Sequence, residues 1–170
     1  MSELIHNNII QCIQSTKDLY HRLVILVGRA GSGKTSILRD IANDYGTTII
    51  NVNLEVSNEL LELTEKQRSL YLPQIFSQIT DKAKSSVVIL DNLEIIFDRN
   101  LNQDPLRLLQ SLSRNCTIVA SWNGVVTAGK LSYAELGHPE YRNYDLIDTL
   151  IVNIDEIVTA DLSKNINEAK

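Results

Sequence analysis

The sequence predicts an α/β fold in which five mainly parallel strands form one sheet between two layers of helices. Short apolar runs alternate along the chain with longer helical stretches, and this alternation is typical of a parallel, doubly wound sheet. The 170 residues, of which 44% are hydrophobic, suffice for one domain with a sizeable core. In such sheets ligands bind beyond the carboxyl ends of the strands, so functional residues are expected there.

The N-terminal segment is predicted to be a helix over about residues 3–19. Its isoleucines recur every fourth residue, at Ile5, Ile9 and Ile13, and this spacing gives the helix one apolar stripe. Residues 1–22 are therefore expected to form a helix that packs on the core.

The main domain is expected over residues 23–155, followed by a polar tail at 156–170. Continuous apolar runs of strand length are typical of strands covered on both faces. The five predicted strands are RLVILVG at 22–28, TTIINVNL at 47–54, VVILD at 87–91, CTIVASW at 116–122 and TLIVNI at 149–154.

Helices are predicted between the first three strands. Residues 34–45 precede Gly46, and glycine commonly ends a helix. Residues 57–86 are predicted to be helical in pieces, because Pro73 would break a single helix and suits the first turn of a new one.

The segment between the third and fifth strands combines a helix start with a long loop. Asp104 can cap a helix and Pro105 suits its first turn, so a helix is predicted over residues 105–113. Residues 123–145 are polar and aromatic-rich and are predicted to be a loop. Its stretch YAELGHPEYRNY suggests an interface with protein or nucleic acid, although the same residues could simply cover the core.

Composition limits the possible binding partners of the protein and the cellular compartment in which it is expected. A net charge of −5 argues against a surface coated in basic residues, so DNA binding is possible only through a local patch. Cys12 and Cys116 lie far apart, without zinc spacing or a disulfide framework. Because neither a signal peptide nor a membrane span is evident, a soluble cytoplasmic protein is expected.

The segment GRAGSGKT at residues 28–35 matches the phosphate-binding pattern G-x-x-x-x-G-K-[ST] in full, with a strand before it and a helix after it. Glycines let the backbone curl so that its N–H groups point at phosphate oxygens, and the helix N-terminus adds partial positive charge. Lys34 is expected to reach the β- and γ-phosphates, and the Thr35 hydroxyl to bind magnesium. The predicted cofactors are ATP, with GTP left open, and Mg²⁺. The predicted nucleotide-binding residues are Gly28, Arg29, Ala30, Gly31, Ser32, Gly33, Lys34, Thr35 and Ser36.

Asp91 ends the third strand and is the second predicted magnesium residue. ATPases that carry such a phosphate-binding loop usually place a glutamate directly after that aspartate, but here the next residue is Asn92. Asn92 can orient a water molecule and cannot accept a proton. Glu94 lies two positions on and would point to the same side in an extended chain, so it is the candidate catalytic carboxylate. The alternative is that a helix has already begun and Glu94 is solvated.

This layout resembles the P-loop NTPases, in particular the division that includes the AAA+ ATPases, over about residues 23–154. The resemblance implies a polar sensor residue at the end of the fourth strand, for which Ser121 and Asn123 match and Asn123 is favoured. It also implies an arginine that acts on a neighbouring subunit of an oligomer, with Arg142 and then Arg114 as candidates. AAA+ proteins usually carry a helical lid, and too few residues follow the fifth strand for one to be expected here.

Four segments are more specific and are similar to the small P-loop protein of BREX bacteriophage-exclusion systems, the BrxF family. They are LDNLEIIFD, DPLRLLQSLSRN, VASWNG and YAELGHPEYRNY. The resemblance implies a role in phage defence beside other BREX proteins.

Three functions are compatible with these patterns. The first is a Mg²⁺-dependent ATPase that acts as a homo-oligomer in a defence complex. The second is an ATP-dependent binding switch with little or no turnover, which Asn92 favours. The third is a small-molecule kinase, which the lack of an arginine-rich lid disfavours.

Overall fold

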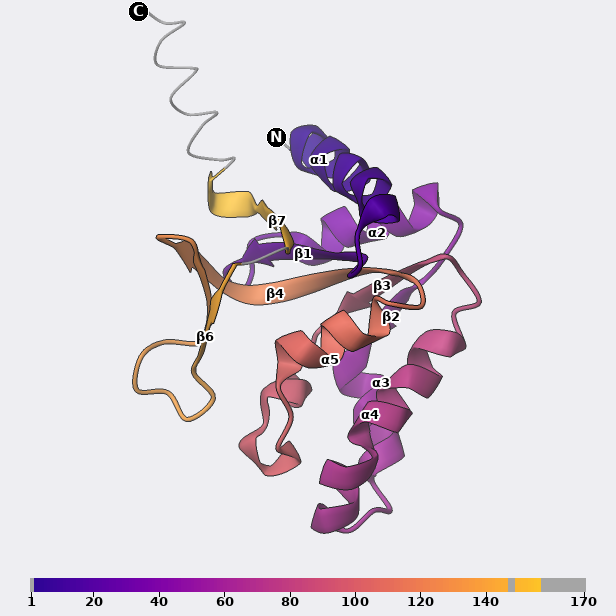
Figure 1. The fold of residues 1–170 in the computed structure, drawn as a ribbon, viewed down its shortest axis with the longest axis vertical. Helices are drawn as coiled ribbons and strands as arrows, with labels where there is room; N and C mark the ends of the chain where they lie inside the picture. Colours follow the sequence, from indigo (N-terminus) through magenta and orange to yellow (C-terminus); the bar gives the residue numbers. More distant parts are fainter. Residues whose placement is uncertain (1, 147–148, 157–170) are drawn as a thin grey trace, which may run out of the picture.

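The computed structural model describes residues 2–146 and 149–156, and its centre is a parallel β-sheet (Figure 1). The strand order is β2–β3–β4–β1–β7, and each neighbouring pair along it runs parallel. These strands span Leu23–Gly28 (β1), Ile49–Asn51 (β2), Val87–Asp91 (β3), Thr117–Thr127 (β4) and Leu150–Asn153 (β7). The predicted α/β fold is confirmed, and the five predicted strands form the parallel part of the sheet.

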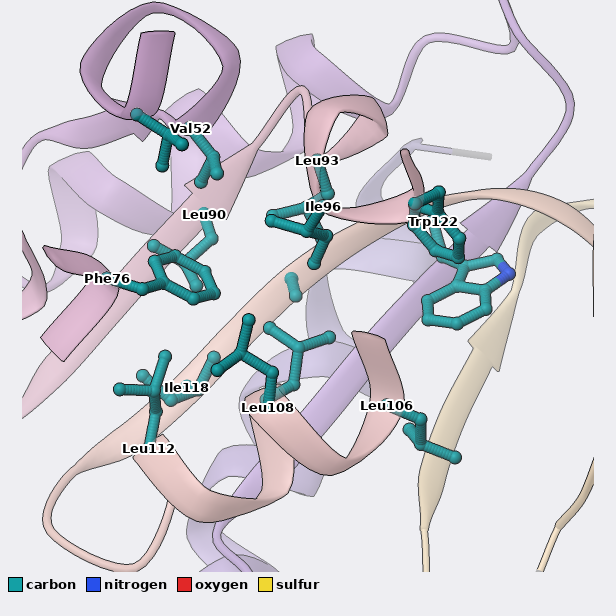
Figure 2. Close-up of a cluster of buried hydrophobic side chains, with 14 of the residues drawn as sticks. Val52, Phe76, Leu90, Leu93, Ile96, Leu106, Leu108, Leu112, Ile118 and Trp122 are labelled. Atoms are coloured by element: carbon teal, nitrogen blue, oxygen red, sulfur yellow. The ribbon is translucent and has the colours of Figure 1, made fainter. Parts of the chain in front are cut away.

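Helices cover both faces of the sheet and complete the three layers (Figure 1). On one face lie α1 (Ser2–Ser15) and α2 (Lys34–Asp44), and on the other lie α3 (Val52–Leu60), α4 (Glu65–Asp81) and α5 (Pro105–Leu112). Alternate residues of β1 point into the two cores, which is why its whole sequence is apolar. Figure 2 shows the larger core, where Phe76, Leu108 and Ile118 meet beneath α5.

The predicted N-terminal helix is present and shorter than expected. The three isoleucines of its predicted apolar stripe, Ile5, Ile9 and Ile13, are all buried against β1 and α2. The α-helix ends at Ser15 and continues as a 3₁₀ turn, η1 (Thr16–Asp18), whose first hydroxyl donates to the carbonyl of Ile13.

The second strand is much shorter than predicted, because α3 begins already at Val52. Asn51 caps this helix: its side-chain oxygen accepts a hydrogen bond from the Leu54 N–H at 3.2 Å. The apolar run 47–54 therefore contains a strand end, a cap and a helix start, and its assignment to one strand was wrong.

Pro73 does not break the helix as predicted, since α4 runs through it from Glu65 to Asp81. A proline in a helix leaves the carbonyl four residues earlier without its N–H donor. Here that carbonyl belongs to Ser69, and it accepts a hydrogen bond from Gln103 Nε2 at 3.0 Å. A side chain distant in sequence thus replaces the missing bond, which local sequence rules could not foresee.

Replacing Pro73 with alanine is expected to stabilise the fold, since Pro73 is solvent-exposed. Removing the ring restores a helical N–H and should gain about 3 kcal/mol, less about 1 kcal/mol for the freer unfolded chain. We expect the free energy of unfolding to rise by about 2 kcal/mol in urea titrations. As a control, Gln103→Ala should destabilise the wild type more than it destabilises the Pro73→Ala variant, because in that variant the backbone N–H at position 73 can bond the Ser69 carbonyl. A lower midpoint for Pro73→Ala would contradict this account.

The predicted loop at 123–145 is wrong for most of its length. β4 continues to Thr127 and pairs antiparallel with β5 (Lys130–Tyr133), which pairs antiparallel with β6 (Arg142–Asp145). Residues 130–145, called the β5–β6 arm here, project from the sheet in Figure 1. Gly124 permits the close approach of β5, because a Cβ on it would lie 1.9 Å from the Ser132 carbonyl oxygen. Within the described residues the sheet therefore has seven strands, two more than the five that were predicted.

Beyond β7 the described chain continues only to residue 156, and no helical lid follows β7 within that part. The predicted polar tail lies, from residue 157 on, outside the described residues. None of the helices in the described ranges is long and apolar enough to cross a membrane.

Candidate nucleotide-binding site

The phosphate-binding segment forms a loop between β1 and α2, at the carboxyl end of β1. Gly31 and Gly33 have φ angles of +77° and +93°, a region in which side chains are strained. Gly33 is the N-cap of α2, and no side chain caps this helix. The N-terminal N–H groups of α2 are therefore available to an anion placed in the loop.

Lys34 is the first residue of α2, and its side chain folds back across the loop. Its ammonium donates hydrogen bonds to the carbonyls of Gly28 at 2.9 Å and Arg29 at 2.8 Å, and to Ser32 Oγ at 3.3 Å. Only 6% of Lys34 is exposed. Three of the predicted loop residues thus hold the lysine at the mouth of the phosphate cradle.

Burial lowers the pKa of Lys34 below its ordinary value, and the negative charges of Asp91, Glu94 and Asp155 oppose that shift. Three acidic side chains therefore lie near enough to the lysine to act on its charge. Their negative potential favours a cation close to Lys34.

Asp91 lies at the carboxyl end of β3 and is only 4% exposed. One carboxylate oxygen accepts a hydrogen bond from Thr35 Oγ1 at 2.6 Å, and the other accepts one from Ser121 Oγ at 2.6 Å. The two predicted magnesium residues are thus in direct contact, although β4 lies between β1 and β3, because all these parallel strands end at one edge of the sheet and α2 starts there. Ser121 orients the carboxylate from β4.

Glu94 reaches the same region by another route than predicted. The chain does not stay extended after Asp91, because a 3₁₀ helix, η2 (Glu94–Phe97), begins at Glu94 itself. One Glu94 oxygen accepts from Asn53 Nδ2 at 2.7 Å and the other from Asn123 Nδ2 at 2.5 Å. The extended-chain argument was wrong. A helix has already begun at Glu94, as the alternative held, but Glu94 is half-buried and hydrogen-bonded and not solvated.

Asn92 makes this route possible. Its φ of +55° lies in the left-handed region, where asparagine is enriched among residues other than glycine. This turn reverses the chain between β3 and η2, and the Asn92 carbonyl accepts the Asn53 N–H at 2.9 Å. The residue that replaces the usual glutamate therefore has a conformational reason to be asparagine.

A cavity of about 570 Å³ collects most of the predicted residues. Its lining comprises Ala30, Gly31, Gly33, Lys34, Thr35, Ser36, Arg39, Asp91, Asn92, Glu94 and Asn123. Of the other predicted nucleotide-binding residues, Gly28, Arg29 and Ser32 contact the Lys34 ammonium. The loop, the acidic strand end and the Glu94 pair therefore face one space.

The two predicted arginines lie outside this cavity lining. Arg142 is on β6, paired in register with Tyr133 of β5. Arg114 precedes β4, at the amino end of the sheet, and its guanidinium lies 4.8 Å from the centroid of the Tyr20 ring. Neither acts on the cavity of its own chain in this arrangement, so their roles toward a neighbouring subunit stay predictions.

Sequence reasoning missed two residues of the site. Asn53 was placed inside a predicted strand, whereas it lies in the first turn of α3, where its Oδ1 also accepts the Ile95 N–H at 2.8 Å. A polar residue just past the second strand was the signal that could have found it. Arg39 lines the cavity because it follows Thr35 by four residues and so shares its helix face.

Comparison with known proteins places this site in a family. The model of the ATPase family associated with various cellular activities (AAA) matches residues 24–121, more than half of the chain. That range contains Lys34, Asp91 and Glu94 and ends two residues before Asn123. No protein of curated function matches the sequence.

Solved structures with similar folds are larger proteins. PCH-2 of C. elegans is 18% identical, with 90% of this chain and 42% of that chain covered and a TM-score of 0.45. AMPPCP-bound DnaA from Aquifex aeolicus is 14% identical, with 67% of this chain and 36% of that chain covered and a TM-score of 0.39. A DNA replication initiation factor is 12% identical, with 95% of this chain and 50% of that chain covered and a TM-score of 0.47. This chain spans half or less of their length. The family match, together with the loop and cavity described above, shows that the chain belongs to the AAA family of ATPases.

Proposed function

We propose that the protein binds ATP with Mg²⁺ in this cavity and hydrolyses the γ-phosphate. The observation that carries the proposal is the convergence of three groups on one space: Lys34, the Thr35–Asp91 pair and Glu94. Lys34 would exchange its bonds to loop carbonyls for bonds to phosphate oxygens. The N-terminus of α2 would complete the cradle.

The oxygens of Thr35 and Asp91 fit a magnesium ion. Magnesium prefers oxygen ligands and takes only one or two from protein, with water and phosphate oxygens as the remainder. This agrees with the absence of any cluster of three acidic, histidine or cysteine ligands in the described part of the chain. A magnesium ion bound there would neutralise charge on the β- and γ-phosphates.

Glu94 is proposed as the base that takes a proton from the attacking water. A carboxylate can accept a proton, whereas the Asn92 amide cannot. Asn53 and Asn123 hold the two carboxylate oxygens from α3 and β4, so the position of Glu94 is set from two elements. Asn123, which donates to Glu94, is proposed as the sensor residue that responds to the γ-phosphate.

The same hydrogen bonds favour one alternative function, an ATP-dependent switch with little turnover. Both Glu94 oxygens already accept hydrogen bonds from asparagine amides, which leaves fewer lone pairs free to receive an attacking water. In this alternative, bound ATP changes which partners the protein binds without being consumed.

Assembly into a homo-oligomer is proposed to supply positive charge to the γ-phosphate. In the described chain, Arg39 is the only arginine that lines the cavity, and its side chain is exposed. Arg142, or else Arg114, is proposed to enter the cavity of a neighbouring subunit, where such an arginine can raise hydrolysis by about 10³–10⁵-fold.

The proposed setting is a bacterial anti-phage complex of the BREX type, with other BREX proteins as partners. The support is the resemblance of four segments to the BrxF family, one of which carries Asp91, Asn92 and Glu94. The residues 23–155 would act as the nucleotide-binding unit, in the cytoplasm. DNA contact would require the oligomer to align basic residues, since the net charge is −5.

Turnover should depend on protein concentration. We expect phosphate release per subunit to rise steeply as the protein assembles, and mass in solution to increase with a non-hydrolysable ATP analogue and Mg²⁺. Chelation of Mg²⁺ should abolish turnover. ATP binding with no phosphate release at any concentration would select the switch, and no binding at all would refute both functions.

A mixing experiment tests the arginine in trans. Arg142→Ala should be inactive alone, while its mixture with Lys34→Ala should regain activity, because the Lys34→Ala subunit supplies Arg142 to an intact cavity. Arg107→Ala, a change at an exposed arginine, is the matched control and should stay active. If mixing restores nothing, the same experiment with Arg114→Ala decides for or against the second candidate.

A further inference from the structure

Four aromatic side chains from four different elements meet between η2 and the β5–β6 arm. Phe97 ends η2, Trp122 lies on β4, Tyr133 on β5 and Tyr144 on β6. Phe97 stacks on Tyr133 with ring centroids 3.5 Å apart, and Trp122 packs edge-on against Phe97 at 5.0 Å and Tyr144 at 5.8 Å. These four residues are called the aromatic cluster here.

The aromatic cluster is joined to the nucleotide site at two points. Glu94 and Phe97 are the first and last residues of η2, and residues three apart in a 3₁₀ helix lie on the same side. Trp122 directly precedes Asn123, which donates to Glu94. Leu93 and Ile96 are buried in the core beside Trp122 (Figure 2).

η2 has little backbone support of its own. Where this single turn joins the chain, Ile96 N–H donates to the Leu93 carbonyl and Asp98 N–H to the Ile95 carbonyl, both at 3.1 Å, and Ile95 N–H donates to Asn53 Oδ1 at 2.8 Å. So short a helix cannot fix its own orientation, since its nucleation is costly. The side-chain stack of Phe97 on Tyr133 therefore adds a constraint on the rotation of η2, and with it on the Glu94 carboxylate, beside the bonds from Asn53 and Asn123.

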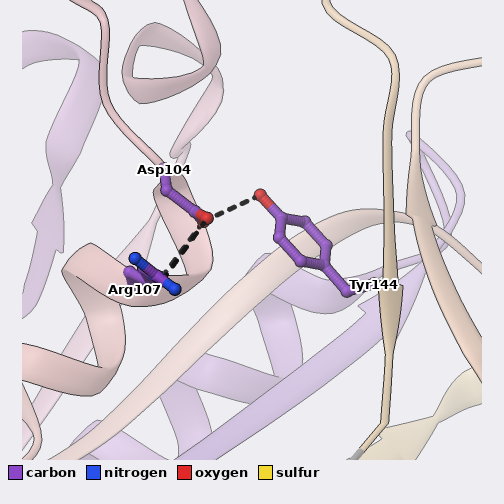
Figure 3. A network of polar contacts seen from close by, with 3 residues as sticks. All are labelled: Asp104, Arg107 and Tyr144. Carbon is purple, nitrogen blue, oxygen red and sulfur yellow. Dashed lines mark hydrogen bonds and ion pairs between the residues drawn. The ribbon is translucent and has the colours of Figure 1, made fainter.

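The arm that carries Tyr133 is itself anchored on two sides. Trp122 Nε1 donates to the Ser132 carbonyl at 3.1 Å, which fastens β5 to β4. Tyr144 donates its hydroxyl to Asp104 Oδ1 at 3.1 Å, which fastens β6 to the start of α5 (Figure 3). Both strands of the arm are thus fastened to the rest of the protein, and β5 contacts Phe97 through the ring of Tyr133.

Burial raises the pKa of Tyr133 to about 12, and the charges of Glu94 and Glu140 add to the effect. The Tyr133 hydroxyl is therefore neutral at physiological pH. Its ring stacks on Phe97 without bringing a charge near Glu94.

We propose that Phe97 and Tyr133 are positioning residues for Glu94, and that the β5–β6 arm thereby controls hydrolysis without touching the nucleotide. This inference rests on the proposed hydrolysis by Glu94. Because Arg142 is the cross-strand partner of Tyr133, a subunit or protein that contacts Arg142 would press on the same stack.

The test compares Tyr133→Leu, which removes the ring, with Tyr133→Phe, which keeps it. Tyr133→Leu should lower kcat about 10- to 100-fold, as a small misplacement of a catalytic group does, and leave the Kd for a non-hydrolysable ATP analogue within twofold. Tyr133→Phe should keep wild-type kcat and Kd. Tyr71→Leu, on α4 and remote from the aromatic cluster, is the matched control. Unfolding followed by the emission of Trp122, the single tryptophan, checks that each variant folds.

Three results would overturn the inference: wild-type kcat in folded Tyr133→Leu, loss of binding together with kcat, or equal loss in Tyr133→Phe. A second readout does not depend on turnover. Amide hydrogen exchange in residues 93–98 should be faster in Tyr133→Leu and unchanged in Tyr71→Leu. If the wild type hydrolyses nothing, the proposed function fails, and this exchange measurement still decides whether the stack holds η2.

Discussion

Glu94→Gln is expected to lower ATP turnover by about 10²–10⁴-fold, the usual contribution of a general base, while ATP binding stays within a few-fold of wild type. Glutamine keeps the shape of the side chain and removes its ability to accept a proton. The hydrogen bonds can largely persist. Asn53 is fixed by the Ile95 N–H and still needs an acceptor, whereas Asn123 can rotate its amide to accept from the new NH₂ group. Phosphate release and titration with a non-hydrolysable analogue measure the two quantities separately.

Asn92→Gly is the decisive comparison, because glycine keeps the left-handed turn and removes only the amide. If Glu94 is the base, Asn92→Gly retains most of the turnover. Glu59→Gln, an exposed position on α3, controls for loss of one negative charge. Turnover that survives Glu94→Gln and disappears in Asn92→Gly would transfer the catalytic role to Asn92.

The fold and the phosphate loop were predictable because local sequence determines both. Strands buried on two faces must be apolar along their buried length, as β1 is and as β3 is up to Asp91, and the loop requires glycine where φ is positive. The contact of Thr35 with Asp91 follows from the topology, since α2 begins after β1 at the same sheet edge where β3 ends in Asp91.

The features that sequence did not predict depend on contacts between distant residues. Pro73 is tolerated because Gln103 donates a hydrogen bond to the Ser69 carbonyl, which lies 34 residues earlier in the chain. The β5–β6 arm has half-polar strands. The turn that joins β4 to the arm uses Ala128 and Gly129, both with positive φ, in place of an Asn-Gly signal. Glu94 enters the site through a left-handed Asn92, which an extended-chain argument could not include.

Lys34→Ala is expected to raise the Kd for ATP by about a hundredfold or more and so abolish turnover at millimolar ATP. A bond between an ammonium and a charged acceptor is worth about 1.5–3 kcal/mol, and Lys34 is proposed to bind both the β- and γ-phosphates. Losing two such bonds costs about 3–6 kcal/mol, where each 1.4 kcal/mol is tenfold in Kd. Part of this is offset, because the free protein must first give up the bonds from Lys34 to the loop carbonyls. Calorimetric titration with ATP and Mg²⁺ gives the Kd directly.

Lys34 also holds the loop together through its bonds to Gly28, Arg29 and Ser32, so the experiment needs a control for a loosened loop in Lys34→Ala. Removing a buried ammonium leaves the Gly28 and Arg29 carbonyls to water and opens space in the loop. Lys34→Met fills much of that space without a charge, so it separates the loss of phosphate binding from a loosened loop. If Lys34→Met binds ATP poorly and Lys66→Ala, a change at an exposed lysine of α4, binds it normally, the charge of Lys34 is what holds the nucleotide. ATP binding at wild-type strength by either Lys34 variant would place the nucleotide elsewhere and remove the basis for every role assigned to this cavity.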